Sequence, residues 1–301
     1  MKQFGKHIRE SKNTLITIMV LMLAALLAGC GRDNVSASSP SEIERVIALS
    51  KSNAELWVLA GGELIATSDD ALKIKGLNED VENLGDMDHV SLEAIVALEP
   101  DLLILFSTDP AQKALGEAAE AAGIKVVFTN IDDYADYETV MKEFTELTGR
   151  SDLYEENVVR VRDRVDEVIA KVPASKEQKS YLLLHVSATK SKAEKNDYFA
   201  SEIFNNLGLS NIASDESVFN ELSMEAIVAA DPDYIFVVPR GDETKALESF
   251  EGIFASDPAW ESLTAVKEGN YRLLSKDLFG LKPNDRWGEA YEEAYKTVYG
   301  E

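Results

Sequence analysis

Cys30 is the only cysteine of the 301-residue chain, and its neighbours indicate the chemistry open to its thiol. A basic start that includes Lys2 and Arg9 leads into an apolar run over residues 15–27, and the small residues Ala28-Gly29 stand directly before the cysteine. A basic end, a short apolar segment and small residues at a cleavage point are typical of a secretory signal peptide. The pattern predicts a lipobox, with a diacyl group on Cys30 and an acylated amine that anchor the chain outside the cell membrane.

Arg240 and His185 are the side chains whose type and position best suit ligand binding. Arg240 follows an apolar run, where a guanidinium could bind an anionic ligand bidentately, although a salt bridge with Asp242 is an equal alternative. His185 stands near the end of another apolar run. An imidazole there could bind haem iron, or it could pack as an ordinary core residue.

Glu93 and Glu225 occupy the same position in two copies of one segment. Val90-Ser-Leu-Glu-Ala-Ile-Val-Ala-Leu-Glu-Pro-Asp101 recurs as Leu222-Ser-Met-Glu-Ala-Ile-Val-Ala-Ala-Asp-Pro-Asp233, and an apolar run follows each copy. The repeat predicts two related lobes. A glutamate just after a capping serine stabilises a helix start, so the helix starts alone could account for both glutamates.

Alternating strands and helices must position these residues. The apolar runs predict strands at 45–49, 64–66, 102–106, 125–129, 181–186, 234–238 and 271–274. Helical spacing and caps predict a first helix that carries Leu56, Trp57, Leu59 and Ala60 and is capped by Ser52 or Asn53. Further helices are predicted at 90–98, 111–122, 199–207, 245–254 and 286–299. Apolar residues spaced by three to five over 152–172 predict one helix of about five turns between the lobes. The fold class is therefore α/β: two Rossmann-like lobes with mainly parallel sheets, joined by a single long helix.

Loops at the carboxyl ends of the strands are expected to face a cleft between the lobes, because α/β lobes bind ligands there. The residues that we expect to bind the ligand are Ser50, Lys51, Ser52, Ser107, Thr108, His185, Lys190, Tyr198, Arg240 and Phe279.

Composition and missing motifs exclude several functions. The net charge of −24 argues against nucleic acid as a partner, because such a field repels phosphate backbones. One cysteine allows neither an intramolecular disulfide nor a thiolate zinc cluster. The chain has no GxSxG elbow, HExxH helix or phosphate-binding glycine loop. We therefore expect no catalytic residues, no resident metal and no covalent cofactor.

Several motifs together resemble the periplasmic binding proteins that serve iron-siderophore, haem and cobalamin ABC importers. The similarity covers about residues 43–300. It rests on the following segments in this order: Arg45-Val-Ile-Ala-Leu-Ser50, both copies of Ser-x-Glu-Ala-Ile-Val-Ala-x-x-Pro-Asp, Leu207-Gly-Leu-Ser-Asn-Ile212, Pro258-Ala-Trp260 and Ala265-Val-Lys267. Lys51 stands where many relatives have proline, and Ser68-Asp69-Asp70 replaces the Tyr or Cys often seen after the second strand.

The resemblance implies a function, a partner and a division of the chain. It implies that an iron-chelate type solute (a ferric siderophore, haem or cobalamin) is bound in the cleft by a monomer and passed to a permease dimer with a cytoplasmic ATPase. It also implies that the helix between the lobes is rigid and that Glu93 and Glu225 dock on permease arginines. The expected parts are a signal peptide (1–29), a lipidated flexible tether (30–42), an N-terminal lobe (43–150), a linker helix (151–173) and a C-terminal lobe (174–301).

Three other functions remain as alternatives. A zinc or manganese receptor of similar architecture would need several histidine ligands, and two histidines after the predicted cleavage point are few for such a site. A secreted α/β hydrolase would share the layers but needs catalytic motifs. A surface adhesin without a transporter is the third alternative.

Overall fold

The structure is a computed structural model that describes residues 43–174, 178–214 and 222–300. The predicted signal peptide, Cys30 and the tether lie outside the described residues, and Ile43–Glu301 forms one compact unit. Within the described ranges, no helix has both the length and the apolar character needed to cross a membrane.

The first sheet contains five parallel strands in the order β3-β2-β1-β4-β5. Their bounds are β1 Val46–Ala48, β2 Ala66–Thr67, β3 Glu82–Asn83, β4 Leu102–Phe106 and β5 Lys125–Thr129. Four helices belong to this half: α2 Lys51–Leu59, α3 Leu92–Ala97, α4 Pro110–Ala121 and α5 Tyr134–Thr148. Strand β1 is completely buried, as expected for a parallel strand covered by helices on both faces.

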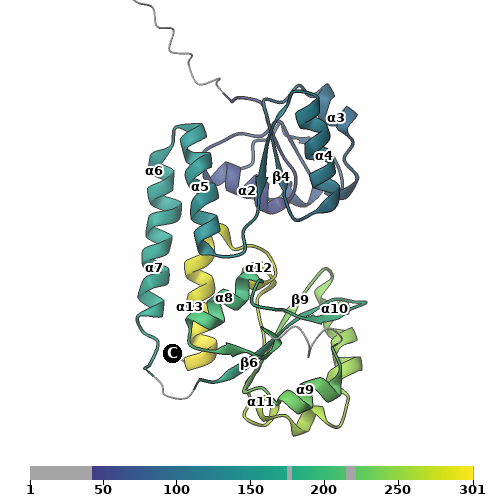
Figure 1. The fold of residues 1–301 in the computed structure, drawn as a ribbon, viewed down its shortest axis with the longest axis vertical. Coiled ribbons are helices and arrows are strands. Elements are labelled where there is room, and N and C mark those ends of the chain that lie inside the picture. The colour runs from purple at the N-terminus through teal and green to yellow at the C-terminus, as the bar shows by residue number, and fades with distance from the viewer. Residues whose placement is uncertain (1–42, 175–177, 215–221, 301) are drawn as a thin grey trace, which may run out of the picture. The chain divides into compact units, whose positions relative to one another are not determined.

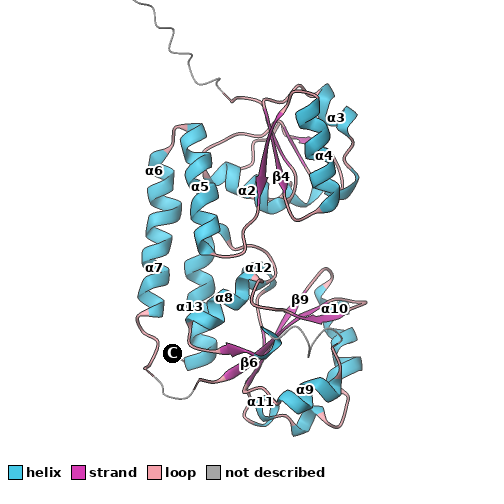
Figure 2. Cartoon of the chain, in the orientation of Figure 1, coloured by secondary structure: helices cyan, strands magenta, loops and turns pink. Residues whose placement is uncertain are grey.

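The second sheet has the order β10-β9-β6-β7, and β8 pairs with β6. Its strands are β6 Ser180–Val186, β7 Ser191–Ala193, β8 Ser210–Asn211, β9 Tyr234–Pro239 and β10 Tyr271–Leu273. Only the β6–β7 pair is antiparallel among the described pairs of this sheet. The helices are α8 Phe199–Asn206, α9 Met224–Ala230, α10 Glu243–Phe250, α11 Thr264–Lys267, α12 Lys276–Phe279 and α13 Trp287–Tyr299. Figure 2 shows helices beside the strands of both sheets, which confirms the predicted α/β fold class.

The segment between the two sheets is helical from residue 151 to residue 169. It consists of α6 Ser151–Tyr154, a π-helical turn over Glu155–Val159 and α7 Arg160–Ile169. Helix α13 returns alongside α7 (Figure 1), where Arg164 donates two hydrogen bonds to Glu292, at 2.6 and 2.8 Å. The predicted single helix thus contains a π turn and packs against a second helix. The division of the chain at residues 150 and 173 stays a prediction.

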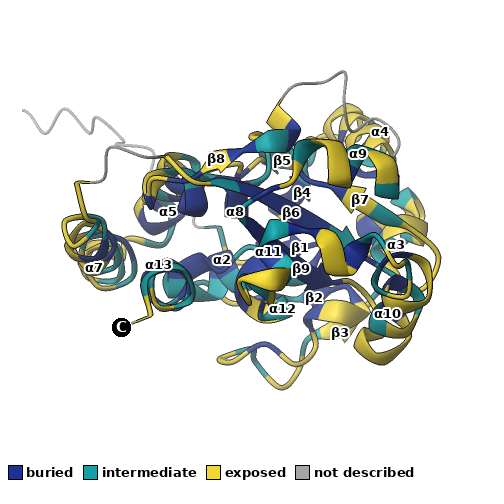
Figure 3. Cartoon of the chain, turned by 90° about the horizontal axis from the view of Figure 1, so that it is seen from below, coloured by how far each residue is buried: buried dark blue, intermediate teal, exposed yellow. Residues whose placement is uncertain are grey.

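The largest apolar core includes side chains from both halves of the compact unit. Trp287 at the start of α13 is fully buried and contacts Tyr134 of α5 and Phe199 of α8, with ring centroids 5.7 and 5.8 Å apart. Two smaller cores cover the other faces of the sheets. Figure 3 shows buried strands inside and helices with exposed outer faces around them. The two halves therefore share packed apolar contacts as well as a helical connection.

Candidate functional site

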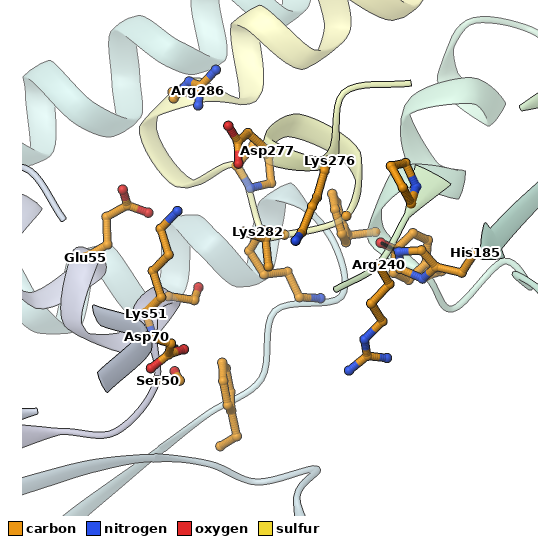
Figure 4. Close-up of a pocket in the computed structure, with 18 of the residues that line it drawn as sticks. Ser50, Lys51, Glu55, Asp70, His185, Arg240, Lys276, Asp277, Lys282 and Arg286 are labelled. Carbon is orange, nitrogen blue, oxygen red and sulfur yellow. Dashed lines mark hydrogen bonds between the residues drawn. The ribbon is translucent and has the colours of Figure 1, made fainter. Parts of the chain in front are cut away.

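A cavity of about 380 Å³ lies between the two sheets and is lined by side chains from both halves. Its volume is in the range of small-molecule sites. The first half contributes Ser50, Lys51, Ser52, Glu55, Asp70, Met87 and Phe106. The second half contributes residues of β6, β7 and β9, the start of α8, and the segment from α12 to α13. Figure 4 shows labelled side chains from both halves, such as Lys51 and Arg240, around the cavity.

The first turn of α2 forms the wall on the first half. Ser50 caps this helix, because its Oγ accepts a hydrogen bond from the Asn53 backbone N–H at 3.3 Å. The cap predicted at Ser52 or Asn53 is therefore wrong by two or three positions. Asp70 closes the turn, since its carboxylate accepts the Lys51 N–H at 2.9 Å and the Ser68 hydroxyl at 2.6 Å.

His185 and Glu194 form a largely buried pair on the opposite wall. Their Nδ1–Oε1 distance is 2.9 Å, and Lys192 Nζ lies 3.0 Å from the other Glu194 oxygen. Burial alone would raise the pKa of Glu194, but the hydrogen bonds from His185 and Lys192 outweigh it and hold the pKa below its usual range. With the Nδ1 proton donated to this carboxylate, the Nε2 of a neutral His185 carries the free lone pair.

Tyr198 stands beside this pair and remains protonated. Burial raises its pKa well above the ordinary value, so the hydroxyl is a hydrogen-bond donor at neutral pH. It donates to the Phe279 carbonyl at 2.5 Å and lies 3.5 Å from His185 Nε2. The hydrogen bond to Phe279 and the edge contact with His185 hold the Tyr198 ring in the cavity wall.

The segment between α12 and α13 reaches across to the first half. Lys282 Nζ donates to the Ile131 carbonyl and lies 4.9 Å from the centre of the Phe199 ring. Burial lowers the pKa of Lys282. Asn284 Nδ2 donates to Glu55 Oε2 at 2.7 Å, and burial raises the pKa of Glu55 although this hydrogen bond opposes the shift. These contacts connect the two walls behind the cavity.

Positive side chains outnumber negative ones around the cavity. The cationic residues are Lys51, Lys192, Arg240, Lys276, Lys282 and Arg286, and the acidic ones are Glu55, Asp70, Glu194 and Asp277. In a chain with a net charge of −24, this is a local reversal of sign. The arrangement can attract and orient an anion.

Six of the ten residues predicted to bind a ligand line the cavity: Ser50, Lys51, Ser52, His185, Tyr198 and Arg240. The predicted alternative partner of Arg240, Asp242, instead caps α10 and lies 3.4 Å from Lys245. The guanidinium of Arg240 is exposed on the cavity side (Figure 4).

The other four predicted residues do not line this cavity. Ser107 donates to the Thr129 carbonyl at 3.3 Å and joins the ends of β4 and β5, while Thr108 is exposed just before α4. Lys190 lies in the turn of the β6–β7 hairpin and is not among the lining residues. The Phe279 side chain is fully buried in the core, and only its carbonyl reaches Tyr198.

Sequence reasoning missed several lining residues. Glu55 lies one helical turn after Ser52, so the i, i+3 spacing of α2 was an available signal. Lys192 belongs to strand β7, which is too short and polar to be recognised, and Glu194 directly follows that strand. Lys276 lies in a loop predicted to face the cleft but was not singled out.

Glu93 and Glu225 have equivalent, exposed positions in the first turns of α3 and α9. The hydroxyls of Ser91 and Ser223 cap these helices by accepting the N–H groups of Ala94 and Ala226, each at 3.2 Å. The two glutamates make no hydrogen bond or ion pair with the part of the chain that the structure describes. Their carboxylates are therefore accessible to a partner.

Two lobes, a helical connection and one cavity between them define the architecture of a solute-binding protein. The chain belongs to the periplasmic binding protein family, whose sequence pattern matches residues 46–278. This match confirms the family resemblance drawn from the sequence motifs.

Two Bacillus subtilis (strain 168) proteins are similar to the chain over nearly their whole length. The uncharacterized ABC transporter substrate-binding lipoprotein YvrC is 25% identical in an alignment of 320 positions, gaps included, that covers 96% of this chain and 98% of YvrC. The Fe(3+)-citrate-binding protein YfmC is 25% identical in an alignment of 326 positions that covers 97% of this chain and 99% of YfmC.

Solved structures share the fold. The haem complex of Staphylococcus aureus IsdE has a TM-score of 0.72 at 16% identity and covers 85% of this chain and 98% of that chain. The vitamin B12-binding protein BtuF of Vibrio cholerae has a TM-score of 0.70 at 19% identity and covers 85% of this chain and 97% of that chain.

Proposed function

We propose that the chain is the extracytoplasmic receptor of an ABC importer and that it binds an iron-chelate type solute between its lobes. The observation that carries this proposal is the cavity to which both halves contribute polar and charged side chains, in a chain of the periplasmic binding protein family. The Fe(3+)-citrate-binding protein YfmC and the similar structure of IsdE in complex with haem support the chelate class.

The remaining parts of the proposal concern attachment and delivery. Lipidated Cys30 holds the chain at the membrane, and the lipoprotein description of YvrC supports this assignment. Glu93 and Glu225 dock the loaded monomer on the permease, while the cytoplasmic ATPase drives uptake. The receptor releases its solute chemically unchanged, because binding and delivery need no catalytic step.

Equilibrium binding tests the proposed function. We expect the full-length chain, purified in detergent, to bind at least one of ferric citrate, ferrioxamine B, haemin or cyanocobalamin saturably, with a Kd of about 1 μM or tighter. Tryptophan fluorescence and ligand absorbance report binding, and chromatography of the released ligand should recover it intact. Binding of none of the four, or release of an altered product, would contradict the proposal.

A further inference from the structure

The cavity carries a charge pattern that selects among chelates. We infer that its ligand is a polyanionic ferric chelate, held between Lys51 of the first lobe and Arg240 of the second. This inference rests on the proposed function and specifies the class of its solute. The argument depends on which charged groups around the cavity are already paired within the protein and which are not.

Three of the four acidic side chains in the wall are engaged by protein groups. Asp70 accepts the Lys51 N–H and the Ser68 hydroxyl, and Glu194 is bound by His185 and Lys192. Glu55 accepts from Asn284, and burial raises its pKa, which favours its neutral form. These three acids therefore have donors within the protein, and the charge of Glu194 is balanced by Lys192 at 3.0 Å.

The positive side chains divide into occupied and unoccupied groups. Lys276 Nζ donates to the Gly241 carbonyl at 2.7 Å, Lys282 to the Ile131 carbonyl, and Arg286 to Glu289 at 2.9 Å. In contrast, the Lys51 ammonium and the Arg240 guanidinium have no hydrogen bond or ion pair with any of the described residues. Figure 4 shows Lys51 and Arg240 on opposite sides of the cavity, on α2 and after β9.

Two unpaired cations that face one cavity from opposite lobes favour a ligand with negative groups on two sides. A neutral or cationic chelate would leave both charges in the cleft without a counter-charge, and removing a charge from water without pairing it costs free energy. A polyanionic chelate pairs with both, and Arg240 suits a carboxylate because its planar fork donates two parallel hydrogen bonds. The same ligand also links the two lobes.

The test compares chelates of opposite charge on the full-length chain. Ferric citrate is the polyanionic probe and ferrioxamine B the cationic one, measured by isothermal titration at low and high salt. We expect ferric citrate to bind at least tenfold more tightly, and its affinity to fall as salt rises. Arg240→Gln and Lys51→Gln should each weaken ferric citrate binding about tenfold or more, because each removes a charge-assisted contact.

Control variants that also remove one positive charge distinguish the loss of a contact in the cavity from a change in the electrostatic field of the whole protein. Lys245→Gln on α10 and Lys113→Gln on α4 remove exposed cations that lie outside the cavity, and we expect an unchanged Kd. Arg240→Lys should keep more affinity than Arg240→Gln. Tight ferrioxamine B binding with weak ferric citrate binding, or an unchanged Kd in both cavity variants, would overturn the inference while the proposed function stands. Failure to bind any of ferric citrate, ferrioxamine B, haemin and cyanocobalamin would overturn both.

Discussion

Replacing both Glu93 and Glu225 with alanine is expected to reduce uptake of the bound chelate at least tenfold while its Kd for the chain stays unchanged. The two carboxylates are exposed at equivalent positions of the repeat and lie outside the cavity. Truncating one partner of a charge pair in a protein interface costs about 2–5 kcal/mol when the other charge is left unpaired. Two such losses at one docking surface would abolish most delivery, whereas ligand binding does not involve these helices.

Uptake of ⁵⁵Fe-labelled chelate by cells that carry the native importer measures the effect. The control is a Glu117→Ala, Glu248→Ala variant, which removes one exposed helical glutamate from α4 and one from α10. This control should transport at the rate of the unmodified chain. Normal uptake by the Glu93→Ala, Glu225→Ala variant would mean that the glutamates serve only their own helix starts.

Trp287→Ala is expected to lower the free energy of unfolding by about 3–5 kcal/mol, the usual cost of emptying a large aromatic site in a core. Trp287 is fully buried and contacts Tyr134 and Phe199, which belong to different halves of the chain. Because the indole joins α5 to α8, we expect the cavity left by alanine to loosen the contact between the lobes as well as the core.

Urea denaturation of the full-length chain, followed by circular dichroism, measures this change. Trp287→Phe is the matched variant, since it keeps an aromatic ring and removes an indole N–H that has no hydrogen-bond partner among the described residues. It should retain most of the stability. A loss below about 1 kcal/mol for Trp287→Ala would show that the site collapses around the smaller side chain and does not hold the lobes together.

Most of the fold could be predicted because its strands are short apolar runs bounded by turn residues. Strands β4 and β5 begin and end at the predicted residues. Helix α5 was missed although Tyr137, Met141 and Phe144 are buried at helical spacing. Strand β7 was missed for a different reason, since Ser191–Ala193 contains no apolar run and its pairing depends on the neighbouring β6.

The candidate site was predictable where it follows a strand and unpredictable where it depends on distant contacts. Ser50 stands directly after one predicted strand and Arg240 two residues after another, so both were expected from the rule that ligands bind at the carboxyl ends of strands. Lys282 and Asn284 come from a segment without a strand, and they contact Ile131 and Glu55, which are 151 and 229 positions away. The residues next to Lys282 and Asn284 in the sequence do not indicate these contacts, because the contacts form only when the two halves pack together.

Locating iron directly tests the central claim that a ferric chelate binds between the lobes. Crystals of the full-length chain grown with ferric citrate would be measured at the iron absorption edge, where anomalous scattering marks each iron atom. We predict one strong peak in the cavity between the first turn of α2 and Arg240, with chelate density touching Lys51 and Arg240. An iron peak elsewhere on the chain, or none at saturating chelate, would contradict the account.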